Sequence, residues 1–189
     1  HGLLEPDAIE LASAALKAAV SDAGPSNRPS IGYMRRDGAR ARSGWCYGAP
    51  GYAAALYTAG SLLDCNEAVN TAIVMARDEV AHRAIEEQAL YDAGLCHGWG
   101  GIWVSLRHIF DDHRAGDLSG IHDQARQQVV QAIDAAAAGA PPLFYPTGPT
   151  DSRFDATFLT GLLGVSLAAL DCAQLGLRPM RPFWPDALL

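Results

Sequence analysis

Two cysteines and one histidine stand out in this sequence because each lies directly before a glycine motif. Cys46 precedes Gly48-Ala49-Pro50-Gly51, and the pair Cys96 and His97 precedes Gly98-Trp99-Gly100-Gly101. Two thiolates and one imidazole are typical zinc ligands, and three protein ligands leave the fourth tetrahedral position open for water or a substrate. No Cys-x-x-Cys pair is present, so two buried cysteines and a capping histidine form the alternative interpretation.

The glycine motif occurs a third time, as Gly161-Leu162-Leu163-Gly164, here without a thiol or an imidazole in front of it. Each motif leads into an apolar segment, and the intervals between motifs can hold one apolar and one more polar helix. This pattern indicates a repeated helical hairpin. If the glycine-headed helices lie side by side, Cys46, Cys96 and His97 meet at one end of them. In the alternative interpretation, the glycines only allow close helix packing in an ordinary bundle.

The chain as a whole predicts an all-α fold, because alanine and leucine dominate and apolar residues recur every three or four positions. Stacked hairpins predict an α/α toroid, or part of one, with the glycine-headed helices inside and the more polar helices outside. We expect one domain spanning residues 1–189, with helices over 6–21, 51–63, 65–76, 79–91, 101–112, 120–138 and 156–173.

Composition excludes several classes of function. The 189 residues are 49% hydrophobic, which predicts a folded chain, and the net charge of −7 argues against binding to nucleic acid or to anionic lipid. No apolar stretch approaches the roughly 20 residues that cross a bilayer, and no signal-peptide pattern follows His1. We therefore expect a cytoplasmic protein without a membrane span, whose four cysteines are reduced.

The segment Arg42-Ser43-Gly44-Trp45-Cys46-Tyr47-Gly48-Ala49-Pro50-Gly51, together with Cys96-His97-Gly98, resembles the paired zinc motifs of LanC-type lanthionine synthetase cyclases. The resemblance continues through residues 158–164 to Phe183 and Trp184, and so covers about residues 36–189. It implies an α/α toroid and one zinc ion (Zn2+) held by Cys46, Cys96 and His97. The implied reaction adds a peptide cysteine thiol to dehydroalanine or dehydrobutyrine and forms a thioether ring.

The resemblance also implies active-site roles for Arg42 and Tyr47. Arg42 would supply a fixed cation or orient a neighbouring acid; alternatively, it belongs to a solvated charge cluster over residues 35–42. Tyr47 would donate a hydrogen bond beside the metal or pack against Trp45. His1-Gly2 resembles the start of the family's His-Gly-x-x-Gly element, which would make His1 the catalytic acid, with a tag remnant or an unnatural chain start as the alternative.

Family members are about twice as long, so we expect most of the N-terminal half of the family domain, with its catalytic Asp, to be missing. The expected partners are a dehydrated precursor peptide and a dehydratase or a complementary chain or domain. The alternative function is a non-catalytic module that binds zinc and peptide and requires a partner chain. A carbohydrate-active α/α-toroid enzyme is disfavoured, because no pair of acids stands at the starts of the glycine-headed helices.

Overall fold

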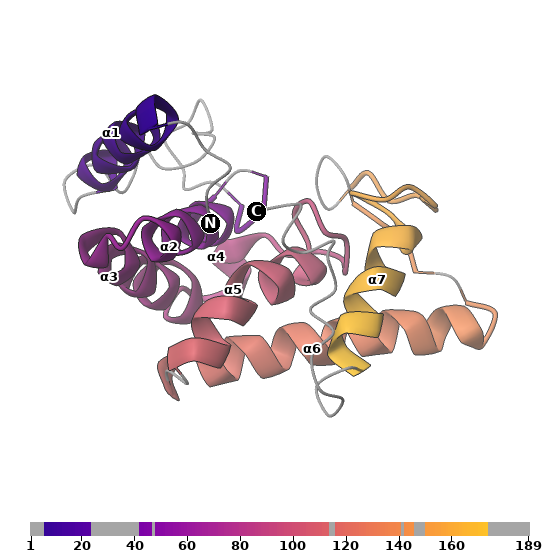
Figure 1. Ribbon diagram of the computed structural model, residues 1–189. Helices are drawn as coiled ribbons and strands as arrows, with labels where there is room; N and C mark the ends of the chain where they lie inside the picture. Colours follow the sequence, from indigo (N-terminus) through magenta and orange to yellow (C-terminus); the bar gives the residue numbers. More distant parts are fainter. Residues whose placement is uncertain are drawn as a thin grey trace.

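The computed structural model describes residues 6–23, 42–46, 48–113, 116–140, 142–145 and 150–173. These residues are mainly helical (Figure 1). Within them, the strand-like pairing is confined to one isolated antiparallel bridge between Phe144 and Arg153. The expected all-α class is confirmed, and the toroidal arrangement of the helices stays a prediction.

The described helices follow most of the expected windows. The first is α1 (Pro6–Asp22), followed by α2 (Ala49–Leu62), α3 (Asn66–Met75), a π-helical turn η2 (Ala76–Ala81), α4 (Ile85–Gln88), α5 (Trp99–His113), α6 (Gly116–Ala137) and α7 (Leu162–Ala173).

Two expected helices were wrong in part. The window 79–91 is interrupted because Ala84 is extended, and α4 ends at Ala89 in the left-handed conformation. In the window 156–173, the helix begins only at Leu162. The Asp155 carboxylate accepts hydrogen bonds from the Thr157 backbone (2.7 Å) and the Thr160 hydroxyl (2.6 Å). Such side-chain bonds to nearby groups compete with helix formation.

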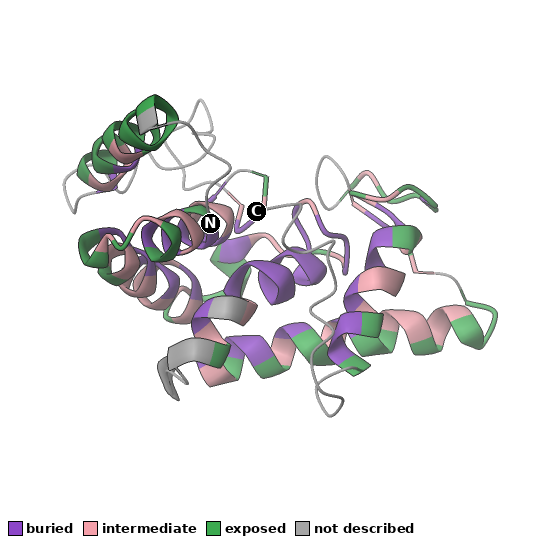
Figure 2. Ribbon diagram, viewed as in Figure 1, coloured by how far each residue is buried: buried purple, intermediate pink, exposed green. Residues whose placement is uncertain are grey.

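The three glycine-headed helices are neighbours in space. Helix α2 packs on α5, and α5 packs on α7, while α3 pairs with α2 and α6 pairs with α5 (Figure 1). The described side chains of α5 are buried over its first two turns, whereas buried and exposed residues alternate along α6 (Figure 2). This alternation is typical of an amphipathic helix that covers a core from one side. The predicted hairpins are therefore present as α2–α3 and α5–α6.

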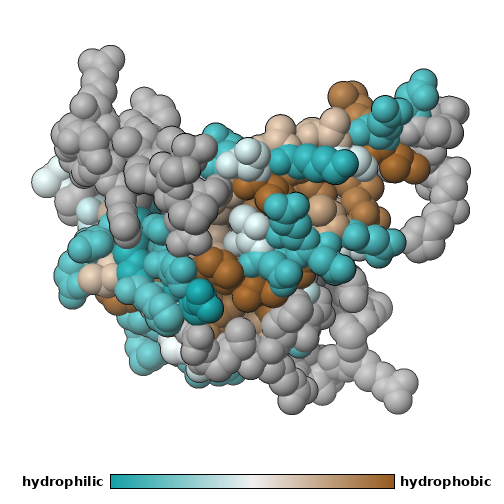
Figure 3. All heavy atoms as spheres, turned by 90° about the vertical axis from the view of Figure 1, so that its left-hand side faces the viewer, coloured by the Kyte–Doolittle hydropathy of each residue, from teal (hydrophilic) through white to brown (hydrophobic). Residues whose placement is uncertain are grey.

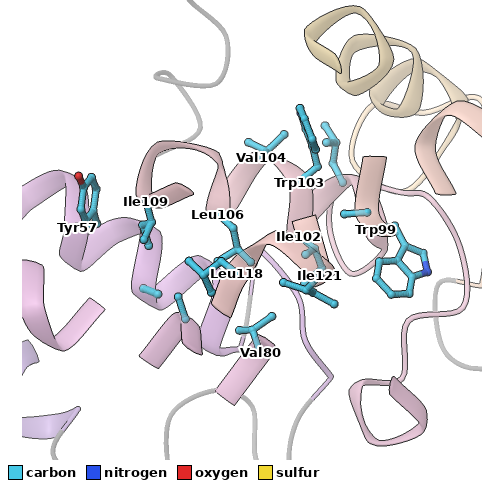
Figure 4. Close-up of a cluster of buried hydrophobic side chains, with 14 of the residues drawn as sticks. Tyr57, Val80, Trp99, Ile102, Trp103, Val104, Leu106, Ile109, Leu118 and Ile121 are labelled. Atoms are coloured by element: carbon cyan, nitrogen blue, oxygen red, sulfur yellow. The ribbon is translucent and has the colours of Figure 1, made fainter. Parts of the chain in front are cut away.

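The core is formed by side chains of α5 and α6 together with others from α2, α3, η2 and α7 (Figure 4). Ile102, Leu106 and Ile109 of α5 are 0% exposed, as is Leu118 of α6. Removing each of these side chains from water stabilises the fold by about 1.5–3 kcal/mol. Trp103 of α5 is also 0% exposed, so it packs in the core.

The face formed by the first three helices carries both hydrophobic and hydrophilic side chains. Figure 3, seen from the side of α1, α2 and α3, shows hydrophobic side chains between hydrophilic ones. Among the helices that the structure describes, none has the length and apolar character that a bilayer-crossing segment requires.

A buried polar network ties α7 to α5. The Asp171 side chain is 1% exposed, accepts a hydrogen bond from Trp103 Nε1 at 2.9 Å and pairs with the Arg107 guanidinium. Arg107 also lies 3.5 Å from the carboxylate of Asp111, one helical turn further along α5. A carboxylate desolvated to this degree requires a charged or hydrogen-bonded partner. The buried charge of Asp171 is therefore stabilised by Trp103 and Arg107 of α5.

Replacing His122 with phenylalanine should flatten the dependence of stability on pH between 7 and 5. His122 is 3% exposed and stacks between Trp103 and Phe110, with ring centroids 4.2 and 4.1 Å away. Burial lowers the pKa of His122, so the unfolded chain, in which the histidine pKa is about 6.5, binds its proton more readily. Stability is then lost as pH falls below about 6.5, by at most about 1.4 kcal/mol per pH unit.

Urea unfolding at a series of pH values measures this slope. Phenylalanine keeps the aromatic stack but cannot titrate. Equal slopes for the wild-type chain and His122→Phe would contradict the prediction.

Candidate metal centre

Three loops of the same form precede α2, α5 and α7, beginning at residues 42, 92 and 155. In each loop, the second glycine of the motif lies so close to a backbone carbonyl six positions earlier that an added Cβ would overlap with it. Only glycine permits this approach, which explains why the motif recurs. The pairs are Gly51 with Trp45, Gly101 with Leu95, and Gly164 with Phe158.

Equivalent positions of neighbouring loops are joined by backbone hydrogen bonds. Cys46 donates its N–H to the Cys96 carbonyl at 3.3 Å, and Cys96 donates its N–H to the Leu159 carbonyl at 2.8 Å. This loop ladder, residues 46, 96 and 159, places the same position of each loop beside the next. Cys46 and Cys96 meet for this reason, although they are far apart in sequence.

The three predicted ligands lie together at the ladder. The sulfur atoms of Cys46 and Cys96 and a ring nitrogen of His97 are all within 4.8 Å of one another. Zinc binds sulfur at about 2.3 Å and nitrogen at about 2.0–2.1 Å, so small side-chain rotations bring all three atoms onto one ion. Two soft sulfurs and one imidazole fit Zn2+ in donor type as well. Across the part of the chain that the structure describes, this is the one such group of potential ligands.

Burial differs across the site. His97 is 8% exposed, Cys96 is partly buried, and Cys46 is exposed to solvent. The histidine side of the group is therefore fixed within the protein, while the Cys46 side can be reached from solution.

The pKa values of two ligands are shifted in opposite directions. The pKa of the Cys96 thiol is raised, first by its hydrogen bond with the Cys46 side chain and then by burial. Burial, together with the nearby positive charge of Arg42, lowers the pKa of His97, which keeps the imidazole neutral as a ligand must be. The Cys96 thiol therefore stays protonated at neutral pH until a metal displaces its proton.

Arg42 connects this site to its surroundings. Its Nε donates to the Ala89 carbonyl at 3.0 Å, Nη2 to the His97 carbonyl at 3.2 Å, and Nη1 to the Tyr145 carbonyl at 3.3 Å. Its guanidinium carbon also lies 5.0 Å from the centre of the Tyr91 ring, within cation–π range. Arg42 is thus a fixed, partly buried cation, and its assignment to a solvated charge cluster is wrong. Its catalytic role stays a prediction.

Comparison with known protein families agrees with these motifs. A family model described as "Lanthionine synthetase C-like protein" matches residues 1–189. This chain belongs to the lanthionine synthetase C-like family. The match begins further toward the N-terminus than the resemblance over residues 36–189. A comparison with curated proteins gives no match.

Sequence reasoning missed a second residue that holds the ligand loops of this lanthionine synthetase C-like chain. The Asp92 carboxylate accepts one hydrogen bond from the Gly94 N–H and another from the Tyr145 N–H, each at 2.8 Å. Asp92 thereby fixes the turn that leads into Cys96. A signal existed in the repeat: Asp92 precedes the first glycine of its motif by the same interval as Arg42 and Asp155 do in theirs.

The third loop of the lanthionine synthetase C-like chain carries no ligand. Leu159 and Thr160 occupy the positions that correspond to Cys96 and His97. Two proposed active-site residues, Tyr47 and His1, lie outside the described residues, as do Phe183 and Trp184. Their roles stay predictions.

Replacing Gly101 with alanine should lower the free energy of unfolding of this chain by at least about 2 kcal/mol. This is within the range of losses that steric changes in a packed interior cause. The new Cβ would overlap with the Leu95 carbonyl and displace the loop that carries Cys96. Thermal unfolding followed by circular dichroism measures the loss.

Gly120→Ala is a matched control, because Gly120 is an exposed residue of α6 with nothing within 4 Å of an added Cβ. This change should stabilise the chain by about 0.5–1 kcal/mol through helix propensity. Melting temperatures that shift in the same direction for both variants would refute the steric argument.

Proposed function

We propose that this chain catalyses thioether ring formation in peptides, with zinc held by Cys46, Cys96 and His97. The peptide's cysteine thiol adds to a dehydroalanine or dehydrobutyrine, which gives lanthionine or methyllanthionine. One observation carries the proposal: the three ligand atoms lie within 4.8 Å of one another, with the Cys46 side open to solvent. Membership of the lanthionine synthetase C-like family supports this reading of the site.

The ligand set suits this chemistry. When bound, zinc would keep the substrate sulfur deprotonated at neutral pH, where a free thiol with a pKa near 8.5 is only a few per cent thiolate. Cys46 and Cys96 contribute two negative charges, which keep a third sulfur electron-rich. Arg42 holds the His97 backbone in place through the carbonyl of that residue.

The addition is balanced without a redox partner. The sulfur forms a bond to the β-carbon while the carbon–carbon double bond breaks, and negative charge moves onto the adjacent carbonyl oxygen. One proton then adds to the α-carbon, which balances the one proton that the thiol has lost. The step requires a cation or donor near the oxygen and an acid near the carbon. We propose that Arg42 supplies a fixed positive charge near the oxygen without direct contact, and we propose Tyr47 and His1 for proton donation.

The proposed partner is a ribosomally made peptide that carries dehydrated serine or threonine, so a dehydration reaction must precede this one. A dehydratase, or a complementary chain or domain, is proposed as the second partner. We also propose a cytoplasmic location for the chain.

A non-catalytic module that binds zinc and peptide is the second candidate. The three nitrogens of the Arg42 guanidinium each donate to a backbone carbonyl. This arrangement favours a structural use of Arg42 over contact with a substrate.

A turnover assay separates these functions. Zinc-loaded protein is incubated with a peptide that contains one dehydroalanine and one cysteine, and the remaining free thiol is measured by alkylation and mass spectrometry. The enzyme should consume the thiol faster than the uncatalysed reaction does, and Cys96→Ala should not. Peptide binding without consumption would support the module, and a chain that binds neither zinc nor peptide would contradict both candidates.

A further inference from the structure

Exposed apolar side chains gather beside the metal centre. Phe154 is 55% exposed, Leu143 50%, Tyr91 40% and Leu159 39%, and Tyr145 is partly exposed. A single exposed apolar residue is ordinary, but a group beside a candidate site indicates a binding surface. We call these five residues the apolar ridge.

The bridge between Phe144 and Arg153 sets the direction of two ridge residues. Phe144 and Arg153 exchange backbone hydrogen bonds of 2.8 and 3.0 Å, and Phe144 is 0% exposed. Leu143 and Phe154 flank this bridge directly, and because side chains alternate between the two faces of an extended segment, they project from the face opposite to Phe144. Phe144 therefore anchors the segment, and Leu143 and Phe154 face solvent.

The ridge is fixed relative to the metal ligands. Both peptide groups of Tyr145 are held, because its N–H donates to Asp92 at 2.8 Å and its carbonyl accepts from Arg42 at 3.3 Å. The same guanidinium donates to the carbonyl of the ligand His97. The carbonyl oxygens of Tyr145 and His97 are therefore bound by the same guanidinium group.

The other ridge residues are tied to the site in similar ways. The Tyr91 ring lies under the Arg42 guanidinium and meets the Tyr145 ring edge-on at 6.3 Å. Leu159 accepts the backbone hydrogen bond of the ligand Cys96. Tyr91, Tyr145 and Leu159 are thus each in contact with Arg42 or with the ligand Cys96.

We propose that the apolar ridge binds apolar side chains of the peptide on either side of its reacting cysteine, and so determines which peptides are accepted. This inference rests on the proposed function, which supplies the peptide as the occupant. An extended peptide advances about 3.3 Å per residue, so residues one to three positions from a metal-bound cysteine lie within about 10 Å of it. The hydrogen bonds of Arg42 to the Tyr145 and His97 carbonyls, and of Cys96 to Leu159, join the ridge to the ligands over such short ranges.

The experiment measures peptide binding, which does not require turnover. Two labelled cysteine peptides, one with leucine and phenylalanine beside the cysteine and one with serine at both positions, are titrated with zinc-loaded protein by fluorescence anisotropy. The apolar peptide should bind about tenfold more tightly, the factor expected when one large apolar side chain moves about halfway out of water. Leu143→Ser and Phe154→Ser should each reduce this preference several-fold, without loss of zinc.

Leu62→Ser is the matched control. Leu62 is 74% exposed but ends α2, at the far end of that helix from the metal centre, and its replacement should leave the preference unchanged. Circular dichroism confirms that each variant is folded.

Each outcome decides the proposal. Equal affinity of the wild-type chain for both peptides, or a preference that survives in Leu143→Ser/Phe154→Ser, would overturn the ridge while cysteine-dependent binding still supports the proposed function. A chain that takes up no zinc and binds neither peptide would contradict the proposed function and the ridge with it.

Discussion

Replacing Cys96 with alanine should reduce zinc binding from one ion per chain to almost none. The variant keeps Cys46 and His97 but loses one of two thiolates, and two side chains do not complete a zinc site. Changes to groups that only support a metal ligand reduce affinity about 10–100-fold, so loss of the ligand itself should cost more than 100-fold. Metal content after dialysis, and competition with a chromogenic chelator, measure the loss.

Cys65→Ala is the matched control for this experiment. Cys65 is a partly buried thiol directly before α3 and is not a member of the ligand group. It should retain one zinc per chain. A full equivalent of zinc in Cys96→Ala would remove the basis of the proposed chemistry.

Replacing Asp171 with alanine should destabilise the fold by about 3–5 kcal/mol, the cost of leaving one member of a buried ion pair without its partner. Arg107, whose side chain is 13% exposed, would lose its closest carboxylate, and Trp103 would lose its hydrogen-bond acceptor. Helix α7 would then lose its polar connection to α5. Urea unfolding measures the free-energy change.

Two further variants define the cause. Asp171→Asn keeps an acceptor for Trp103 but no charge for Arg107, so its loss should be smaller than that of the alanine variant. Asp134→Asn, at an exposed position of α6, should change stability by no more than about 0.5 kcal/mol. A loss below about 1 kcal/mol in Asp171→Ala would show that the network contributes little.

Much of the arrangement could be predicted from repeated residues. The glycine motifs marked the starts of three neighbouring helices, and the residue types before two of them, together with the resemblance to LanC-type cyclases, predicted Cys46, Cys96 and His97 as one group. Both signals are local: glycine is required where a Cβ would overlap with a carbonyl, and thiolate and imidazole are donor types that suit zinc.

The partners of the residues that hold the site could not be predicted in the same way. Arg42 and Asp92 act on backbone groups of Ala89, His97 and Tyr145, and every residue type presents the same backbone carbonyl. Sequence therefore cannot identify these partners before the fold brings them together. The interruption of the helix expected over 79–91 was missed for a related reason, since Ala84 and Ala89 favour helices by their residue type.

The loop ladder has a consequence for how such a site could arise or move. Its hydrogen bonds join main-chain atoms, so the spacing between positions 46, 96 and 159 does not depend on which side chains stand there. Two pairs of neighbouring loops are therefore joined in the same way, and only the first pair has cysteine or histidine at these positions on both loops. Point substitutions at Leu159 and Thr160, without any rebuilding of the scaffold, would be the shortest route to relocating or duplicating the metal position.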